Sequence, residues 1–334
     1  MTKPINFAIL GAGIIAKALA EAVTKMPKED NIIPYAVGSR DLNRAEALRA
    51  EFNFKKAYGS YEEMLNDPEV DLVYVATPHS HHYEHTKLCL NHNKHVLCEK
   101  AFTANAQQAR EIISLAEEKK LLLTEAIWPR YMPFAKTIVE ELKSGIIGEV
   151  STLTANLGYV IDHIPRLTDP NLAGGSLLDV GIYPLTFTAI VFGSFTNDNI
   201  ANVVSTCVKH DKTGVDATDS ITITYKDGKM AIIYATMYSL TDREGVITGR
   251  NGYMTIENIN NYQSLSVYDT NRKLIKHIKC PPQINGYEYE VRACLEAIRN
   301  GQIECPDMPH EETIRMMEFM DARRAEWGIK YPFE

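Results

Sequence analysis

The residues Gly11, Ala12 and Gly13 constrain the fold of this chain more than any other feature. They follow the apolar run 5–10 directly, and a helical pattern begins at Ile14. A strand, a tight glycine turn and a helix N-terminus in this order cradle a phosphate, because the free N–H groups of the first helical turn face the anion. Gly11 permits the turn, Gly13 lets the backbone approach a pyrophosphate, and the small Ala16 lets the helix pack close to the strand. The alternative is a glycine turn that binds nothing.

Residues 1–125 alternate apolar strands with amphipathic helices, which is the pattern of a doubly wound parallel sheet. The expected strands are 7–10, 32–38, 72–76, 95–98 and 121–124. The expected helices are 14–25, 41–52, 82–92 and 105–119, with Asp41 and Asn105 as N-terminal caps. The sequence therefore predicts an N-terminal dinucleotide-binding domain of the Rossmann type over residues 1–125.

The pattern changes after Pro129 and Pro133. One helix is expected over 134–143 and two more near the end of the chain, the first of them stopping at Asn300-Gly301. Between them lie alternating runs that predict half-buried antiparallel strands at 151–159, 220–226, 230–238 and 252–257. Residues 126–334 are therefore predicted to form a second, α+β domain. A length of 334 residues suits two domains of ordinary size.

The composition excludes several classes of function. Hydrophobic residues make up 45% and charged residues 23% of the chain, no apolar run approaches the ~18 residues of a membrane span, and the start MTKPINFAIL is no secretory signal. The six cysteines form no C-x-x-C pair, which favours buried free thiols over disulfides or zinc. A net charge of −8 argues against nucleic acid as a partner. We expect a cytoplasmic protein that acts on small molecules.

The end of the second strand predicts which dinucleotide is bound. An acidic residue there would bind the ribose of NAD, whereas a positive side chain accommodates the 2′-phosphate of NADP. Here the sequence is Gly38-Ser39-Arg40, so NADP is favoured and NAD remains possible. Alternatively, Arg40 is a solvated loop charge and Asp41 is the ribose ligand rather than a helix cap.

The segment from Ala76 to His82 follows the strand 72–76, at the carboxyl edge where open α/β sheets bind ligands. Its backbone is expected to line the cofactor. Four histidines lie in or after it, and two of them, His81 and His85, are four residues apart on a predicted helix. A metal site is the alternative, but no carboxylate or cysteine lies at a spacing that would complete the ligand shell. No metal is predicted.

Lys100 ends the hydrophobic strand 95–98 as part of an abrupt Glu99-Lys100 pair. A lysine at the carboxyl end of an inner parallel strand is aimed at the ligand crevice, where it can polarise a carbonyl oxygen. Alternatively, it is a rim lysine paired with Glu99. Further on, a glycine-rich loop precedes Asp179 and Tyr183, which share one face if the stretch is helical. Asp179 has an alternative role as a capping-box partner of Ser176, and Tyr183 as a core aromatic residue.

Taken together, these motifs resemble the glucose–fructose oxidoreductase, inositol dehydrogenase and MocA family. They are G-A-G-I-I-A, A-T-P-H-S-H-H, K-H-V-L-C-E-K-A, E-A-I-W-P-R-Y and G-G-S-L-L-D-V-G-I-Y, in the family's order over essentially the whole chain. Tyrosine at position 183 and the segment from Glu125 to Trp128 most resemble the branch of dimeric dihydrodiol dehydrogenase and D-xylose dehydrogenase. The family's E-K-P is E-K-A here, and Ala101 lacks the fixed φ of proline.

The resemblance implies an α+β domain with a large open, mainly antiparallel sheet that pairs subunits, and NAD(P)-dependent oxidation or reduction of sugars, polyols or diols. By matched position it implies Lys100 as catalytic lysine, Tyr183 as acid/base and Asp179 as the partner of substrate or lysine. The residues assigned to the cofactor are Gly11, Gly13, Ile14, Ile15, Ser39, Arg40, Thr77, Pro78, His82, Glu99, Lys100, Trp128 and Arg130. Those assigned to the substrate are Tyr159, His163, Asp179 and Tyr183, and Tyr131 and Arg166 are further pocket candidates.

The predicted reaction moves hydride between the nicotinamide and a secondary carbinol carbon, while Tyr183 exchanges the hydroxyl proton and Lys100 stabilises charge on that oxygen. Two other hypotheses remain open. One is a cofactor-binding regulator that keeps the fold without turnover. The other is a dehydrogenase of amino or imino substrates, for which no carboxylate-binding and amine-binding groups can be identified. We expect a homodimer or a higher homo-oligomer.

Overall fold

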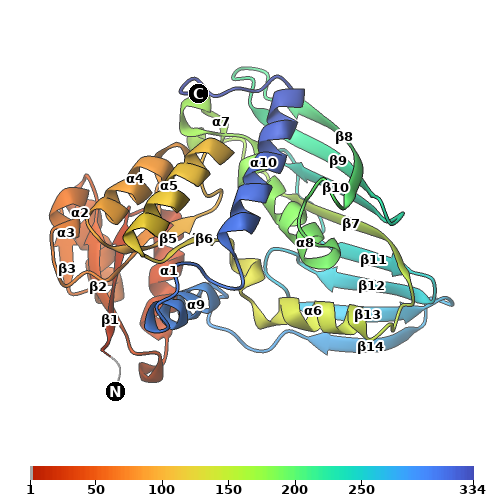
Figure 1. Cartoon of the computed structure of the whole chain (residues 1–334), viewed down its shortest axis with the longest axis horizontal. Helices are drawn as coiled ribbons and strands as arrows, with labels where there is room; N and C mark the ends of the chain where they lie inside the picture. The colour runs from red at the N-terminus through yellow and green to blue at the C-terminus, as the bar shows by residue number, and fades with distance from the viewer. Residues whose placement is uncertain (1–2) are drawn as a thin grey trace. The chain divides into compact units, whose positions relative to one another are not determined.

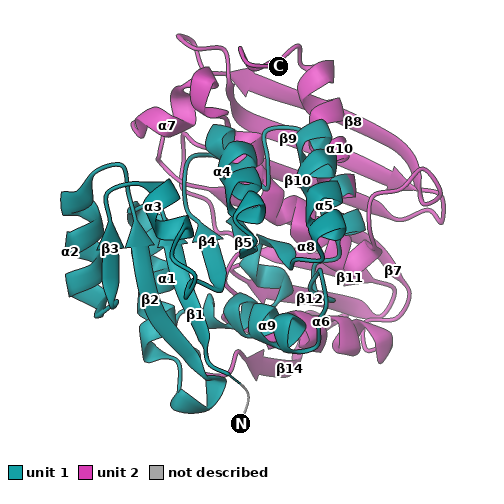
Figure 2. Ribbon diagram, turned by 60° about the vertical axis from the view of Figure 1, so that its left-hand side comes forward, with its two compact units in different colours: residues 1–131, 283–314 teal, residues 132–282, 315–334 magenta. Residues whose placement is uncertain are grey.

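The computed structural model describes residues 3–334 and divides them into two compact units (Figure 2). Among the described residues, unit 1 comprises 3–131 and 283–314, and unit 2 comprises 132–282 and 315–334. The first unit thus ends six residues after the predicted boundary at 125. Unit 1 also includes residues 283–314, which the prediction of one boundary at 125 had placed in the second domain.

Unit 1 contains a six-stranded parallel sheet in the order β3-β2-β1-β4-β5-β6 (Figure 1). Its strands are β1 (Ile5–Leu10), β2 (Ile32–Gly38), β3 (Lys56–Tyr58), β4 (Leu72–Val75), β5 (His95–Glu99) and β6 (Leu123–Ala126). Its helices are α1 (Ile14–Lys25), α2 (Leu42–Phe52), α3 (Tyr61–Leu65), α4 (His79–Asn91), α5 (Ala106–Lys119) and α9 (Glu288–Arg299). Every residue of β1 and β4 is buried, as expected for parallel strands covered on both faces. The predicted Rossmann sheet is confirmed.

Local signals placed most boundaries of unit 1 correctly. Asp41 and Asn105 cap α2 and α5, where their side chains accept hydrogen bonds from the N–H groups of Asn43 and Gln108. The prediction was wrong at α4, which begins at His79 rather than at 82, because Pro78 serves as the N-cap in extended conformation. It was also displaced by two residues at β6, and it missed β3 and α3, which are only three and five residues long.

Unit 2 contains an eight-stranded sheet in the order β14-β13-β12-β11-β7-β10-β9-β8. Its strands are β7 (Val150–Gly158), β8 (Ile200–Lys209), β9 (Asp216–Tyr225), β10 (Met230–Thr236), β11 (Gly245–Gly249), β12 (Gly252–Glu257), β13 (Ser264–Asp269) and β14 (Leu274–Lys279). All neighbours pair antiparallel except β7 and β10, which are parallel. The sheet is therefore mainly antiparallel, as expected. The predictions missed β8, β11, β13 and β14.

The helix α8 (Ile182–Phe192) packs on β7 and β10 and forms the core of unit 2 together with α6 (Pro133–Lys143). A short helix, α7 (Pro165–Thr168), precedes it, and α10 (His310–Glu326) begins in unit 1 and ends in unit 2. Contrary to the sequence-based expectation, the stretch Pro170–Phe192 is long and apolar enough to cross a membrane, yet it is mostly buried inside the protein. This degree of burial is that of a core helix.

Candidate active site

The turn after β1 has the geometry of a phosphate cradle. Gly11 has a φ of +108°, and a Cβ added there would lie 2.8 Å from the carbonyl oxygen of Ala76, so only glycine fits. Gly13 is the N-cap of α1 without any side-chain cap, and nothing lies within 4 Å of the place its Cβ would occupy. Ala16 is fully buried, whereas Ile14 is 89% exposed. The N-terminus of α1 thus offers open N–H groups to an anion, and these residues fit a dinucleotide pyrophosphate.

The connection from β2 to α2 carries Ser39 and Arg40, the residues predicted to bind a 2′-phosphate. Ser39 is buried, and its hydroxyl accepts a hydrogen bond from the N–H of Asp41 at 3.2 Å. The Asp41 carboxylate caps α2 at 2.9 Å, which supports the helix-cap role over that of ribose ligand. Arg40 is exposed. Arg44, which the sequence analysis did not single out, donates to the Ala12 carbonyl at 2.8 Å and so places its guanidinium at the glycine turn.

The segment after β4 is held by its own histidines. The two ring nitrogens of buried His82 lie 2.7 Å from the Thr77 carbonyl oxygen and 2.8 Å from that of Ala101. The Thr77 hydroxyl is 3.0 Å from Nδ1 of His85. Burial lowers the pKa of His85 to about 4 and keeps this ring neutral at physiological pH. Among residues 3–334 no group of three or more His, Cys, Asp or Glu side chains could hold a metal ion.

Lys100 directly follows β5, at the carboxyl edge of the sheet, and is partly exposed. The carboxylate of buried Glu99 accepts hydrogen bonds from the Tyr74 hydroxyl and, at 3.1 Å, from the backbone N–H of Lys100. Burial, with the Glu99 charge next, raises the pKa of Tyr74 well above its usual value, so this phenol remains a donor. The peptide bond between Lys100 and Ala101 is cis. The hydrogen bond from the Lys100 N–H to Glu99 fixes the backbone that carries the lysine.

The segment after β6 is tied into the core of unit 1. Trp128 stacks on Tyr287, with 4.4 Å between ring centroids. Arg130 donates to the Glu312 carboxylate at 2.8 Å and to the Asp307 carbonyl at 3.1 Å. Tyr131 is buried with its hydroxyl on the carbonyl of Glu125, a packing role rather than a substrate contact. These bonds hold the guanidinium of Arg130. The assignment of Arg130 to the cofactor stays a prediction.

Asp179 and Tyr183 lie on a π-helical turn, Leu177–Gly181, and on the first turn of α8 that continues it. Both are buried, with exposed fractions of 6% and 8%. Asp179 accepts a hydrogen bond from Arg166 at 3.0 Å. The capping box with Ser176 is absent from this described turn, since the Ser176 hydroxyl makes no cap bond there. The sequence did not indicate the ion pair between Asp179 and Arg166 of α7, because a separation of thirteen residues has no local signature.

The two remaining substrate candidates differ in their surroundings. The hydroxyl of Tyr159 accepts a bond from the Asn260 amide at 3.2 Å, and the Arg243 guanidinium lies 5.9 Å from its ring centroid. His163 is exposed. Unit 2 thus brings Asp179 to Arg166, and unit 1 brings Gly11 to Thr77. Lys100 and Tyr183 belong to different units, and their pairing stays a prediction.

Comparison with known proteins agrees with this fold. Residues 5–127 match the GFO_IDH_MocA model, an oxidoreductase family with an NAD-binding Rossmann fold, and residues 135–255 match the model of the GFO/IDH/MocA C-terminal domain. The trans-1,2-dihydrobenzene-1,2-diol dehydrogenase of Mus musculus is 33% identical over 338 residues, with 98% of each chain covered. The D-xylose 1-dehydrogenase (NADP(+)) of Hypocrea jecorina is 35% identical, covering 83% of this chain and 78% of that protein.

Solved structures share the fold at lower identity. KijD10, a 3-ketoreductase from Actinomadura kijaniata solved with NADP and TDP-benzene, has a TM-score of 0.87 and 23% identity, covering 97% of this chain and 98% of that one. The aldose-aldose oxidoreductase from Caulobacter crescentus has a TM-score of 0.85 and 20% identity, covering 98% of each chain.

The parallel sheet with its glycine turn, followed by a large mixed sheet, defines a dinucleotide-dependent oxidoreductase. More narrowly, the chain belongs to the Gfo/Idh/MocA family. The predicted family, fold and NAD(P) dependence are therefore confirmed.

Proposed function

We propose that this protein transfers hydride between NADP and the secondary alcohol or ketone of a cyclic trans-diol or an aldose. The observation that carries the proposal is the position of Lys100 directly after β5, on the sheet edge that also bears the glycine turn and Thr77. In an open α/β sheet this edge is where ligand and reacting groups meet. The two relatives named above, a diol dehydrogenase and a xylose dehydrogenase, support this class of substrate.

Each residue of the proposed site has a separate task. When bound, NADP supplies hydride transfer at its nicotinamide ring. The ammonium of Lys100 polarises the substrate oxygen, and the phenol of Tyr183 exchanges the proton of the hydroxyl group. An ammonium near a phenol favours the phenolate and so eases removal of that proton. Asp179, paired with Arg166, orients the substrate or the lysine. Ser39, Arg40 and the first turn of α1 bind the phosphates.

The test is replacement of the two proposed catalytic groups. Lys100→Met and Tyr183→Phe should each lower turnover by ~10²-fold or more, because both act on charge that develops in the transition state. NADP affinity, measured by fluorescence titration, should stay within twofold. Since both groups act on the same oxygen, the double variant should lose far less than the product of the single losses.

The substrate panel of this test should contain D-xylose, other aldoses, inositols and cyclic trans-diols. Lys87→Met, which removes an exposed lysine from α4, is the control for loss of a surface ammonium. If the double variant lost turnover by the full product of the two single losses, Lys100 and Tyr183 would not act on the same oxygen. A wild-type protein that binds NADP and turns over no member of the panel would favour a non-catalytic NADP-binding regulator.

We also propose that the protein is a cytoplasmic homodimer. All six cysteines are free thiols, four of them buried, which suits a reducing compartment. The sheet of unit 2 supports a dimer, because it exposes apolar side chains that a monomer would leave in water. They are Val204, Val208, Ile232 and Tyr234.

A further inference from the structure

The segment that carries Asp179 and Tyr183 rests on a buried polar network that the proposed reaction does not use. The segment begins at Gly174 and Gly175, passes through the π-helical turn and reaches the start of α8. Its backbone is held from two sides within unit 2. One side is the segment 329–334, and the other is the start of β9.

Tyr331 holds the first glycine. Its ring is fully buried, and its hydroxyl donates to the Gly174 carbonyl at 2.9 Å. The Arg324 guanidinium lies over the Tyr331 ring, 4.5 Å from the centroid, and the backbone N–H of Tyr331 donates to the Glu334 carboxylate at 2.9 Å. The tyrosine is therefore fixed both at its ring and at its backbone.

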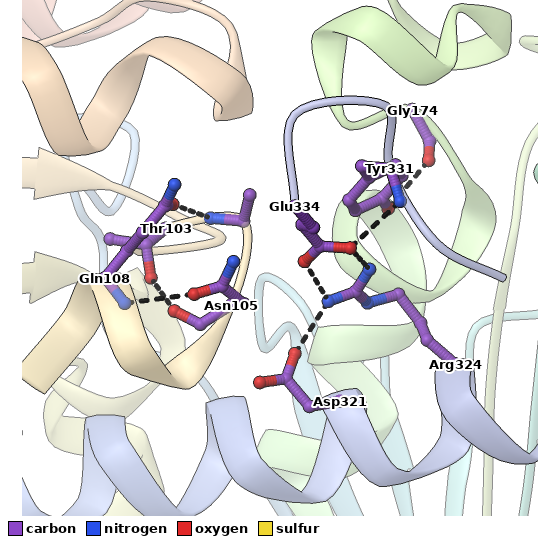
Figure 3. A network of polar contacts seen from close by, with 9 residues as sticks. Thr103, Asn105, Gln108, Gly174, Asp321, Arg324, Tyr331 and Glu334 are labelled. Carbon is purple, nitrogen blue, oxygen red and sulfur yellow. Dashed lines mark hydrogen bonds and ion pairs between the residues drawn. The ribbon is translucent and has the colours of Figure 1, made fainter.

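Arg324 anchors this arrangement. It is 3% exposed and makes a two-pronged pair with Glu334 at 3.0 and 2.9 Å, while one nitrogen also donates to Asp321 at 2.8 Å (Figure 3). Such a bidentate contact fixes direction as well as distance. Figure 3 shows the chain of contacts running from Asp321 through Arg324 and Glu334 to Tyr331 and Gly174.

Asp216 holds the other side of the turn. It is fully buried, and its carboxylate accepts the N–H of Leu177, the first residue of the π-helical turn. A Cβ on Gly175 would lie 2.4 Å from an oxygen of Asp216, and Gly175 has a φ of +132°. The carboxylate thus lies against the backbone, in a gap that only glycine leaves open.

Asp219 lies next to this contact. Both carboxylate oxygens of Asp219 are buried and make no hydrogen bond of good geometry with the described residues. The same is true of the Ser176 hydroxyl. Asp219 also lines a cavity of about 10 Å³ together with Leu177, Gly181 and Pro184. Burial, together with the neighbouring Asp216 charge, raises the pKa of Asp219 well above its usual range.

We propose that Tyr331, anchored by Arg324 and Glu334, and Asp216 are positioning residues that hold the Gly174–Gly181 backbone so that Asp179 and Tyr183 point into the reaction site. The inference rests on the proposed function, since it gives Tyr183 and Asp179 a task that depends on their placement. A misplacement of about 1 Å can lower turnover by about 10²-fold.

The experiment compares two tyrosine-to-phenylalanine variants of the full chain. Tyr331→Phe removes the hydroxyl that holds Gly174. Tyr225→Phe is the matched control, because Tyr225 is also buried on unit 2 but its hydroxyl has no partner in the described structure. Two readouts are taken: hydrogen exchange of the peptide covering 174–183, and the pH profile of kcat on the best panel substrate.

We expect Tyr331→Phe to raise exchange in 174–183 at least fivefold, to lower kcat about tenfold and to shift the pH profile, with NADP affinity unchanged. Tyr225→Phe should match the wild type. Unchanged exchange in Tyr331→Phe, or equal changes in both variants, overturns the proposal. If Tyr331→Phe does not fold, Glu334→Gln decides by the same two readouts, because it weakens the Arg324 anchor. If Tyr183→Phe retains full activity while Tyr331→Phe still raises exchange in 174–183, the proposed function fails and the positioning contact stands.

Discussion

Glu125 shows how a single buried carboxyl can govern pH dependence. It is 1% exposed at the end of β6, where it accepts hydrogen bonds from the Phe102 N–H at 3.1 Å and from the Thr313 hydroxyl at 3.2 Å. Burial raises its pKa to about 7, although both bonds act in the opposite direction. The folded protein therefore favours the protonated form of Glu125 more than the unfolded chain does.

The sign of the resulting effect on stability follows from linkage. The folded pKa of Glu125 lies above the unfolded value of 4.5, so its contribution is fully present below pH 4.5 and is lost as the pH rises through 7. A shift of this size corresponds to about 3 kcal/mol. In Glu125→Gln the side chain stays neutral at every pH. The decrease in unfolding free energy that the wild type shows between pH 4.5 and 7 should therefore be absent from the variant.

Urea unfolding at a series of pH values, followed by circular dichroism, measures the difference between wild type and variant. Other buried carboxyls, such as Glu290 and Asp219, titrate in both proteins and cancel in the difference. Glu118→Gln, on the exposed face of α5, is the control for removing a surface charge. Parallel pH curves for wild type and Glu125→Gln would contradict the prediction.

Among the elements, we expect the β2–α2 connection to decide the choice of dinucleotide. Asp41 is occupied as the cap of α2, so the strand end presents Ser39 and Arg40 rather than a carboxylate, with Arg44 held at the glycine turn. We expect NADPH to bind more tightly than NADH. Arg40→Asp should weaken NADPH far more than NADH, since an arginine–phosphate pair is a charge-assisted bond.

Fluorescence titration of both dinucleotides against wild type and Arg40→Asp measures this selectivity. Arg49→Asp is the control, because it reverses a charge elsewhere on α2, where Arg49 pairs with Glu46. An equal loss for NADPH and NADH in Arg40→Asp, or no loss, would show that Arg40 does not read the 2′-phosphate.

The elements also show which features the sequence could predict. α1, β2 and β12 lie at the predicted residues because a 3.6-residue or two-residue period and a flanking glycine are local signals. β8, by contrast, has no buried residue along its length, and its sequence IANVVSTCVK shows no alternation of apolar and polar residues. The π-helical turn could not be predicted, since its backbone is held by Asp216, which is far away in sequence.

For the whole molecule, the sheet of unit 2 carries the oligomer prediction. The register places Val204, Thr222, Ile232, Thr154, Val246 and Thr255 in one row across six strands. The row contains no charged residue, and Ile232 is 43% exposed. A neutral row of Val, Ile and Thr is unusual on a surface that stays in water, and a second copy of the sheet would cover it.

Light scattering should therefore give about twice the chain mass of 37.6 kDa at micromolar concentration, where an interface of ~1,600 Å² persists. Ile232→Asp should shift the protein towards the monomer. Leu42→Asp, which introduces the same charge at a residue 49% exposed on unit 1, should leave the mass unchanged. A monomeric wild type would refute the prediction.

The sequence by itself determined the Rossmann sheet, its phosphate cradle and the candidate residues Lys100 and Tyr183, because glycine turns, caps and hydrophobic periods act over a few residues. Only the tertiary structure decided what those residues touch. It brought Arg166 to Asp179, Tyr331 to Gly174 and residues 283–314 back to unit 1. The bonds that make these contacts join residues 13, 157 and as many as 267 positions apart. Their formation depends on the packing of whole elements, which no local pattern encodes.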